Sequence, residues 1–167
     1  MTIYVLGPSG VGKTHCAGYA ATILRAEHRD LDALCKGRES DWACCQRAFD
    51  GIESEAKLRQ VFISIDIGAG TQRNRSLELQ QYLMPRRQHV VLVWAPPSEV
   101  IRRKCQWPGR LPEEFEQTEY KTRDPLYSIA THKVDVSCKS RDEAKAQFAR
   151  YIHEAFGVPA RQFPTGQ

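Results

Sequence analysis

Residues 3–14 read IYVLGPSGVGKT, an apolar run followed at once by a glycine-rich loop. Gly7 and Gly12, with Lys13 and Thr14 directly after, keep the spacing GxxxxGK(S/T) of the phosphate-binding P-loop. In such a loop, backbone N–H groups point at phosphate oxygens, and the following helix adds the partial positive charge of its N-terminus. The stretch therefore predicts a strand, a loop that binds phosphate and a helix that begins near Lys13.

Two side chains of this loop suit a nucleotide that is bound with a metal ion. Lys13 can reach the β- and γ-phosphates, and the Thr14 hydroxyl can bind Mg²⁺. The pattern is common to ATPases, GTPases and kinases, so it leaves the fate of the terminal phosphate open.

The length and composition predict a single globular domain, and the net charge is mildly positive. The chain has 167 residues, of which 41% are hydrophobic and 26% charged, and its net charge is +4. It has no Lys/Arg tract with interleaved aromatic residues and no apolar run near the roughly 18 residues of a membrane helix. The cysteines form no CxxC pair. We therefore expect a cytoplasmic protein with reduced thiols that binds neither nucleic acid nor membranes. A monomer is slightly favoured, and the sequence leaves the oligomeric state open.

Apolar runs alternate with helical stretches along the chain. We expect strands at 3–7, 28–31, 61–66, 89–95 and 133–137. We expect helices at 13–26, 41–59, 98–105, 113–130 and 140–156. This alternation predicts an α/β fold, a five-stranded parallel sheet with helices on both faces. It also predicts one domain over 1–156, with a mobile loop at about 106–112 and a flexible tail at 157–167.

Two acidic residues follow the P-loop closely. Asp30 and Asp32 stand in the stretch RDLDAL, and acidic residues two apart at a strand end aim both carboxylates to one side. One carboxylate could hold Mg²⁺, and the other could accept the proton of an acceptor hydroxyl. A surface turn would suit the same pair, and the spacing alone leaves both interpretations open.

A glycine-rich segment and three arginines stand further along the chain. The third strand runs into the stretch Gly68-Ala69-Gly70, where backbone can come close to a ligand. Arg103 and Arg110 flank a loop of Trp, Pro and Gly, and Arg123 precedes the stretch DPLY. Each arginine could bind a ligand or remain a solvent-exposed or ion-paired side chain.

Taken together, these stretches make the chain resemble the shikimate kinase family of small-molecule kinases over most of residues 1–156. The resemblance rests on GPSGVGKT, on the DLD pair at the family's distance from Lys13, and on IGAG where the family has a glycine triplet. It extends to VVLVWAPPSEVIRRK, to the lid stretch GRLP and to RDPLYSIATHKVDVS. It implies the P-loop fold of the nucleoside-monophosphate kinases, with ATP and Mg²⁺ as cofactors.

The resemblance also implies how the chain would bind ATP. Residues of the loop would hold the phosphates through backbone or side chain: Gly7, Gly10, Val11, Gly12, Lys13 and Thr14. Thr14 and Asp30 would hold the magnesium ion. Arg110 would close over the transferred phosphoryl group, and Arg103 would lie against the adenine.

For the acceptor, the resemblance gives three kinds of contact. Asp32 would bind the acceptor hydroxyl and form the catalytic set with Lys13 and Arg110. Arg123 would meet an acceptor carboxylate. Gly68, Ala69 and Gly70 would bring backbone close to the acceptor.

The acceptor half departs from the family in the stretch FDGIE at 49–53, where the family has a stretch like FRRIE. Asp50 stands in place of the arginine that grips the carboxylate of shikimate, while Glu53, that arginine's usual partner, remains. Arg47 shares a helix face with Asp50 and could stand in. Asp66, at the end of the third strand, is a further acid that could bind Mg²⁺ or an acceptor or could simply cap a turn.

These observations predict an ATP-dependent kinase of a small polyhydroxylated molecule, such as a neutral or cationic cyclitol or sugar. One alternative is a genuine shikimate kinase in which Arg47 replaces the missing arginine. Another is a regulatory protein that binds nucleotide without catalysis. A third, a nucleoside or nucleotide kinase, would carry more basic groups for its acceptor than this sequence shows.

Overall fold

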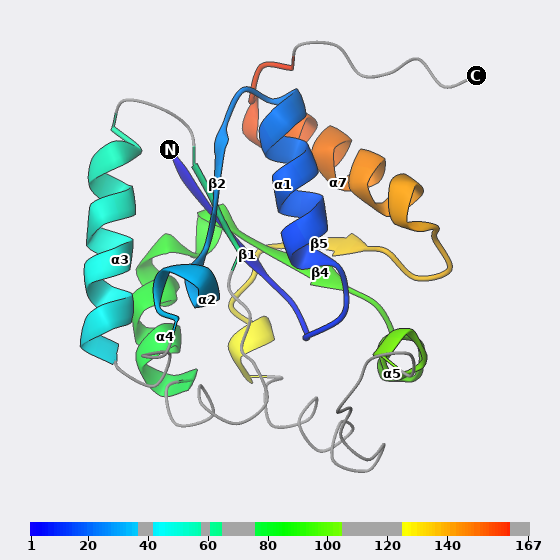
Figure 1. Ribbon diagram of the computed structural model, residues 1–167, viewed down its shortest axis with the longest axis horizontal. Coiled ribbons are helices and arrows are strands. Elements are labelled where there is room, and N and C mark those ends of the chain that lie inside the picture. Colours follow the sequence, from blue (N-terminus) through cyan, green and yellow to red (C-terminus); the bar gives the residue numbers. More distant parts are fainter. Residues whose placement is uncertain (37–41, 58–60, 65–75, 105–124, 161–167) are drawn as a thin grey trace.

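The computed structural model describes residues 1–36, 42–57, 61–64, 76–104 and 125–160 (Figure 1). Its five strands pair in the order β2-β3-β1-β4-β5, and every pair is parallel. Their bounds are β1 Thr2–Leu6, β2 Glu27–Asp30, β3 Val61–Ser64, β4 Val90–Trp94 and β5 His132–Asp135. The predicted five-stranded parallel sheet is therefore confirmed.

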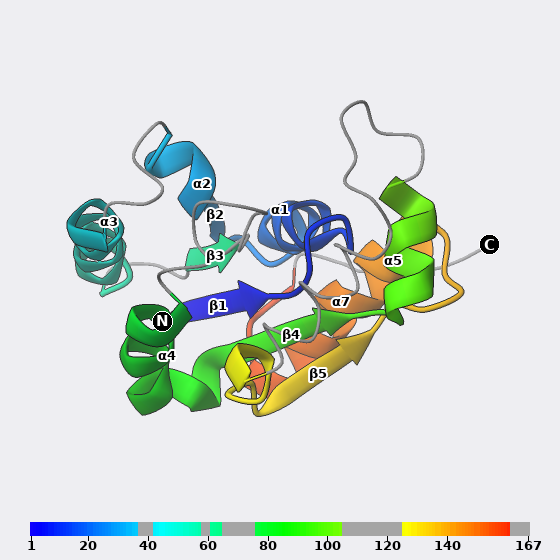
Figure 2. The same ribbon diagram turned by 90° about the horizontal axis from the view of Figure 1, so that it is seen from below.

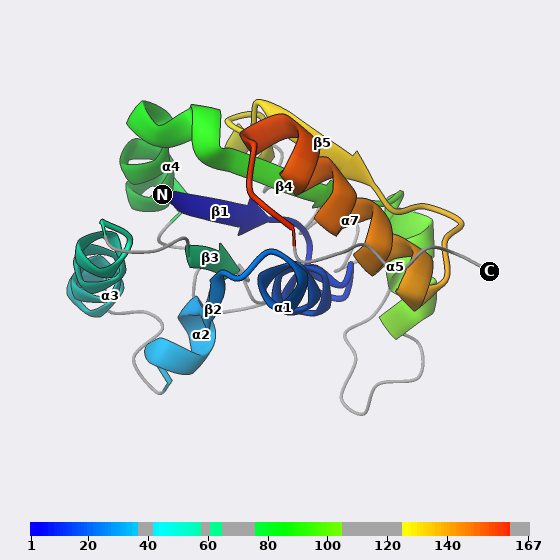
Figure 3. The ribbon, with the colours of Figure 1, turned by 90° about the horizontal axis from the view of Figure 1, so that it is seen from above.

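Helices cover both faces of this sheet, because side chains of a strand alternate between its faces. Ile3 and Val5 of β1 belong to the core under α1 (Lys13–Ile23) and α7 (Arg141–Phe156), which lie side by side (Figures 1 and 3). Tyr4 and Leu6 belong to the core on the opposite face. The helices of that face are α2 (Leu31–Leu34), α3 (Trp42–Glu55) and α4 (Ser76–Leu83) (Figure 2).

Two further helices flank β4. The 3-10 helix η2 (Met84–His89) leads into it, and α5 (Pro97–Lys104) follows it. The carboxyl ends of β1 and β4 therefore open toward the P-loop and α5, the edge where parallel α/β sheets bind ligands. No helix within the described ranges is long and apolar enough to cross a membrane.

The expected tail needs a correction at its start. Gly157 ends α7 in the left-handed conformation typical of a helix C-terminus, but Val158 then folds back and is fully buried in the core under α1 and α7. The Val158 carbonyl also contacts Nδ1 of His153 at 2.6 Å. The chain just after Gly157 is thus part of the domain, and 161–167 lie outside the described residues.

Candidate nucleotide-binding site

The P-loop connects β1 to α1 with a backbone that requires glycine. Gly7 has φ 153°, and a Cβ at this position would lie 2.4 Å from the carbonyl oxygen of Val93 on β4. Gly12 has φ 104° and leads directly into α1. The loop therefore packs against the sheet at its start and turns into the helix at its end, as the spacing predicts.

Lys13 lies inside this loop rather than in solvent. It is only 2% exposed, and its Nζ donates to the carbonyl of Pro8 at 3.1 Å. A buried ammonium that donates to a carbonyl can exchange it for phosphate oxygens, which are stronger acceptors. Lys13 is thus positioned for a bound polyphosphate.

Thr14 and Asp30 meet at the start of α1. The Thr14 hydroxyl donates to Oδ2 of Asp30 at 3.1 Å, while Oδ1 of Asp30 accepts the backbone N–H of Asp32 at 3.0 Å and of Ala33 at 3.4 Å. Asp30 therefore caps α2 and also touches the P-loop. A hydroxyl and a carboxylate beside bound phosphates are the oxygen ligands that Mg²⁺ uses, so this pair fits the metal.

Asp32 lies one element further on than we expected. The sequence predicts that both acids lie at a strand end. In the structure β2 ends at Asp30, whose side chain caps α2, and Asp32 lies in the first turn of that helix. Leu31 between them is buried at 2% exposure, and Asp32 is half-buried. The capping bond ties Asp32 to Asp30, and Asp30 contacts Thr14.

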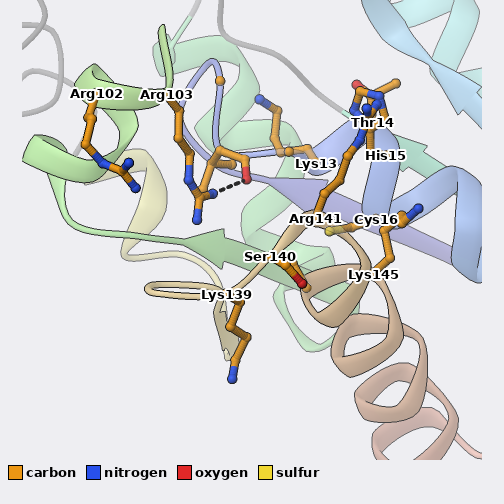
Figure 4. A pocket seen from close by; sticks show the side chains of 14 residues that line it. Lys13, Thr14, His15, Cys16, Arg102, Arg103, Lys139, Ser140, Arg141 and Lys145 are labelled. Atoms are coloured by element: carbon orange, nitrogen blue, oxygen red, sulfur yellow. Dashed lines mark hydrogen bonds between the residues drawn. The ribbon is translucent and has the colours of Figure 1, made fainter. Parts of the chain in front are cut away.

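Arg103 on α5 connects the P-loop, the segment after β5 and its own helix through hydrogen bonds. Its guanidinium donates to the carbonyl of Val11 at 3.2 Å, to the carbonyl of Val136 at 2.9 Å and to Glu99 at 2.6 Å. Figure 4 shows the bond to the P-loop. Arg103 also lines the cavity described next, so its side chain both positions the loop and faces the space beside it.

A cavity of about 640 Å³ opens beside the loop (Figure 4). Its walls come from the loop and the start of α1, from Arg102 and Arg103 on α5, and from the segment 139–145 at the start of α7. Seven of its lining residues are basic: Lys13, His15, Arg102, Arg103, Lys139, Arg141 and Lys145. Among the lining residues that the structure describes, none is acidic. A hollow lined by one sign of charge attracts anions, which agrees with a nucleotide as its ligand.

The charges of this wall also act on His15. Burial lowers the pKa of the His15 imidazole, and the nearby Arg141 and Lys145 lower it further. Two cations from α7 thus lie close to the start of α1.

Glu53, which the sequence assigned to the acceptor site, is held by other side chains of the protein. It accepts hydrogen bonds from the Tyr4 hydroxyl, from the Tyr82 hydroxyl at 2.8 Å and from Nε of Arg86 at 2.6 Å. Burial alone would raise the pKa of Glu53, but the bonds from Arg86, Tyr4 and Tyr82 hold it down at about 2. Burial and the Glu53 contact together raise the pKa of Tyr82 to about 12.

This Glu53 cluster, formed by Tyr4, Glu53, Tyr82 and Arg86, lies away from the P-loop. The N-terminal amine of Met1 donates to the carbonyl of Ala56, so the end of α3 lies beside the beginning of β1. The P-loop follows the other end of β1 (Figure 1). Glu53 therefore has its arginine, but it comes from η2 rather than from α3.

Asp50 and Arg47 are both exposed on α3. Asp66 and the other residues that the sequence assigned to the acceptor site and the lid lie outside the described residues. These others are Gly68, Ala69, Gly70, Arg110 and Arg123. Their roles stay predictions.

Sequence reasoning missed the α7 side of the cavity and the arginine of the Glu53 cluster. Lys139 and Arg141 follow the end of β5, and loops after the carboxyl ends of parallel strands are where ligands bind, so this rule could have found them. Arg86 is 33 positions from Glu53, and no local pattern joins the two.

No family profile matches this chain, and no curated protein matches its sequence. Solved structures do resemble it. The Deinococcus radiodurans tunicamycin resistance protein is 16% identical, with a TM-score of 0.71 over 96% of this chain and 98% of that one. A shikimate kinase from Bacteroides thetaiotaomicron is 20% identical, with a TM-score of 0.65 over 95% of this chain and 99% of that one.

A sugar kinase from Janibacter is 16% identical, with a TM-score of 0.65 over 94% of each chain. At such low identity these likenesses show the fold alone. The chain therefore shares the fold of these solved structures, which include P-loop small-molecule kinases.

Proposed function

We propose that this chain is an ATP-dependent kinase that transfers the γ-phosphoryl group to a hydroxyl of a small polyhydroxylated molecule. The observation that carries the proposal is the continuous set of contacts around the P-loop. Lys13 is buried in the loop, Thr14 touches Asp30, and Asp30 caps the helix that presents Asp32. Solved kinases of shikimate and of a sugar share the fold.

Each residue of this set has a physical task in the transfer. The loop amides and Lys13 would hold the β- and γ-phosphates and stabilise the charge that develops on the phosphoryl oxygens. Asp32 would orient the acceptor hydroxyl and accept its proton as the oxygen attacks phosphorus and the bond to ADP breaks. Thr14 and Asp30 would bind Mg²⁺, which supplies charge neutralisation when present.

The roles that we propose for Arg110 and Arg123 rest on the sequence alone. Arg110 would close over the γ-phosphate, and removing such an arginine lowers the rate by a factor on the order of 10³ or more. Arg123 would face the acceptor together with the GAG stretch at 68–70. Arg103, fastened between the loop and β5, would support the nucleotide wall and lie against the base.

The acceptor we propose is neutral or cationic. Asp50 is an exposed carboxylate where a carboxylate-binding arginine would be needed, and like charges at about 4 Å repel by several kcal/mol at an effective dielectric near 20. Asp50→Arg should therefore improve the affinity for hydroxylated acids such as shikimate and leave ATP affinity unchanged.

The test is ADP release with a panel of acceptors: neutral sugars and cyclitols, amino sugars, and hydroxylated acids including shikimate. We expect release that depends on a neutral or cationic acceptor. Asp32→Asn should lower it by about 10²–10⁴-fold with little change in ATP affinity. Glu154→Gln, an exposed acid on α7 that does not line the cavity, serves as the control for loss of one carboxylate.

Two other outcomes would each exclude part of the proposal. Turnover of shikimate at an ordinary enzymatic rate would refute the acceptor class and favour a genuine shikimate kinase that uses Arg47. Equal ATP binding by the wild type and Asp32→Asn, with no turnover in either, would show a nucleotide-binding regulatory protein.

A further inference from the structure

The cavity beside the P-loop carries more positive charge than the loop alone needs. Arg102, Lys139 and Arg141 line it, and none of the three forms an ion pair with another described residue. Lys145 pairs with Asp142 at 2.6 Å, but the Asp142 side chain is 89% exposed, so that pair is weakened by solvent.

Among the basic residues on the α7 side of the cavity, Arg141 and Lys145 face the P-loop and the start of α1. In Figure 4, Arg141 extends from the start of α7 toward Thr14 and His15 at the start of α1. His15, Arg141 and Lys145 all line the cavity, and the charges of the two α7 residues act on the His15 imidazole. Like charges brought together destabilise the protein unless an anion lies between them.

The polyphosphate of the nucleotide is an anion that could reach them. Its β- and γ-phosphates would lie against the loop amides and Lys13, and the phosphate nearest the ribose would leave the loop toward the α7 wall. The described lining offers a base few neutral polar side chains: Thr14, Ser140 and the imidazole of His15, whose pKa is lowered.

We propose that Arg141 and Lys145 form an anion subsite that is continuous with the P-loop, so that the polyphosphate chain, and not the base, carries most of the donor's affinity. The inference rests on the proposed function in that the cavity holds the phosphoryl donor. It adds a donor class: nucleoside triphosphates with weak discrimination among bases, and inorganic tripolyphosphate as a ligand of comparable affinity.

The experiment measures binding of ATP, GTP and inorganic tripolyphosphate to the full chain by calorimetry with Mg²⁺ and without acceptor. We expect tripolyphosphate and GTP to bind within about tenfold of ATP. Arg141→Gln should weaken all three by about tenfold, and the affinity should fall less steeply with added salt. Arg141→Lys should keep most of the affinity.

Arg150→Gln is the matched control, because Arg150 is exposed on the same helix and does not line the cavity. A thermal melt of each variant shows whether it is folded. Tripolyphosphate binding more than about a hundredfold weaker than ATP would overturn the inference. So would an Arg141→Gln variant that binds all three ligands as the wild type does, or one that weakens ATP alone.

The results also separate this inference from the proposed function. If the three ligands bind as expected but no acceptor is phosphorylated, the kinase proposal fails and the subsite stands. If acceptor phosphorylation is found while tripolyphosphate does not bind, the subsite fails and the kinase stands. If none of the ligands binds, both fail.

Discussion

Two groups of charged side chains lie toward opposite ends of β1, and they differ in whether the protein itself neutralises their charge. In the Glu53 cluster, the carboxylate accepts from two tyrosines and pairs with Arg86, so the charge is neutralised inside the protein. In the cavity beside the P-loop, the described part of the wall is lined by basic residues and includes no carboxylate. The first arrangement stabilises the fold, whereas we propose that the charges of the second bind an anionic ligand.

Lys13→Met should produce the largest effect on the cavity side. The change keeps the length of the side chain but removes the ammonium that would face the β- and γ-phosphates. We expect transfer to fall by about 10²–10³-fold, as for loss of one transition-state donor, and ATP affinity to fall by about 10–100-fold. Steady-state kinetics and calorimetry measure the two.

Lys57→Met is the control for charge alone, since Lys57 is exposed after the end of α3. If Lys13→Met and Lys57→Met weakened ATP binding equally, the loop would not be the phosphate site. The melting temperature of Lys13→Met should stay near that of the wild type, because the loop glycines and not Lys13 set the backbone.

Asp30→Asn should have the next largest effect. Asparagine caps helices as well as aspartate does, so α2 should persist, but the position loses the negative oxygen that faces Thr14. We expect the Mg²⁺ concentration needed for half-maximal ATP binding to rise by about 10–100-fold. A magnesium titration at fixed ATP checks this, and an unchanged requirement would exclude Asp30 as a metal ligand.

Glu53→Gln should affect the stability of the fold and not nucleotide binding. It removes the charge that Arg86 and two tyrosines hold, which should lower the free energy of unfolding by about 1–3 kcal/mol. ATP affinity should not change. Urea unfolding and calorimetry test the two expectations, with Asp50→Asn, an exposed acid on the same helix, as the control. Loss of ATP affinity at unchanged stability would place Glu53 in the binding site after all.

The smallest expected effect is the acid sensitivity of the Glu53 cluster. The pKa of Glu53 is lowered from 4.5 to about 2 in the folded protein, so the unfolded chain takes up the proton first. The contribution is present above pH 4.5 and is lost as the pH falls toward 2. We expect about 1 kcal/mol after screening by solvent, measured as the difference between wild type and Glu53→Gln in urea unfolding at pH 6 and pH 3. Parallel pH profiles of the two proteins would contradict it.

The part of the cavity formed by the P-loop and the start of α1 could be predicted from the sequence, because neighbouring residues determine its geometry. The spacing from Gly7 to Thr14 fixes a loop, and the alternation of apolar runs fixes the sheet that carries it. Asp30 could be placed near the loop but not recognised as a helix cap, since it ends β2 and α2 begins at the next residue, with no loop between them.

The remaining features depend on contacts between distant parts of the chain. Arg86 reaches Glu53 only because η2, which carries it, packs against β1 and α4, and Arg141 faces α1 only because α7 lies along it. A family pattern suggested an acceptor role for Glu53, while the structure gives this side chain three partners within the protein. Residue type and spacing do not reveal such partners before the elements are packed.

The central claim, that the cavity around the P-loop holds a phosphoryl donor for transfer to a hydroxyl, is tested most directly by ³¹P nuclear magnetic resonance. The full chain is incubated with ATP, Mg²⁺ and the acceptor that gives the fastest ADP release. We predict that the γ-phosphate signal moves to that of a phosphate monoester of the acceptor with the wild type and stays on ATP with Lys13→Met. A γ-phosphate that stays on ATP, or becomes inorganic phosphate at the same rate with and without acceptor, would contradict the claim.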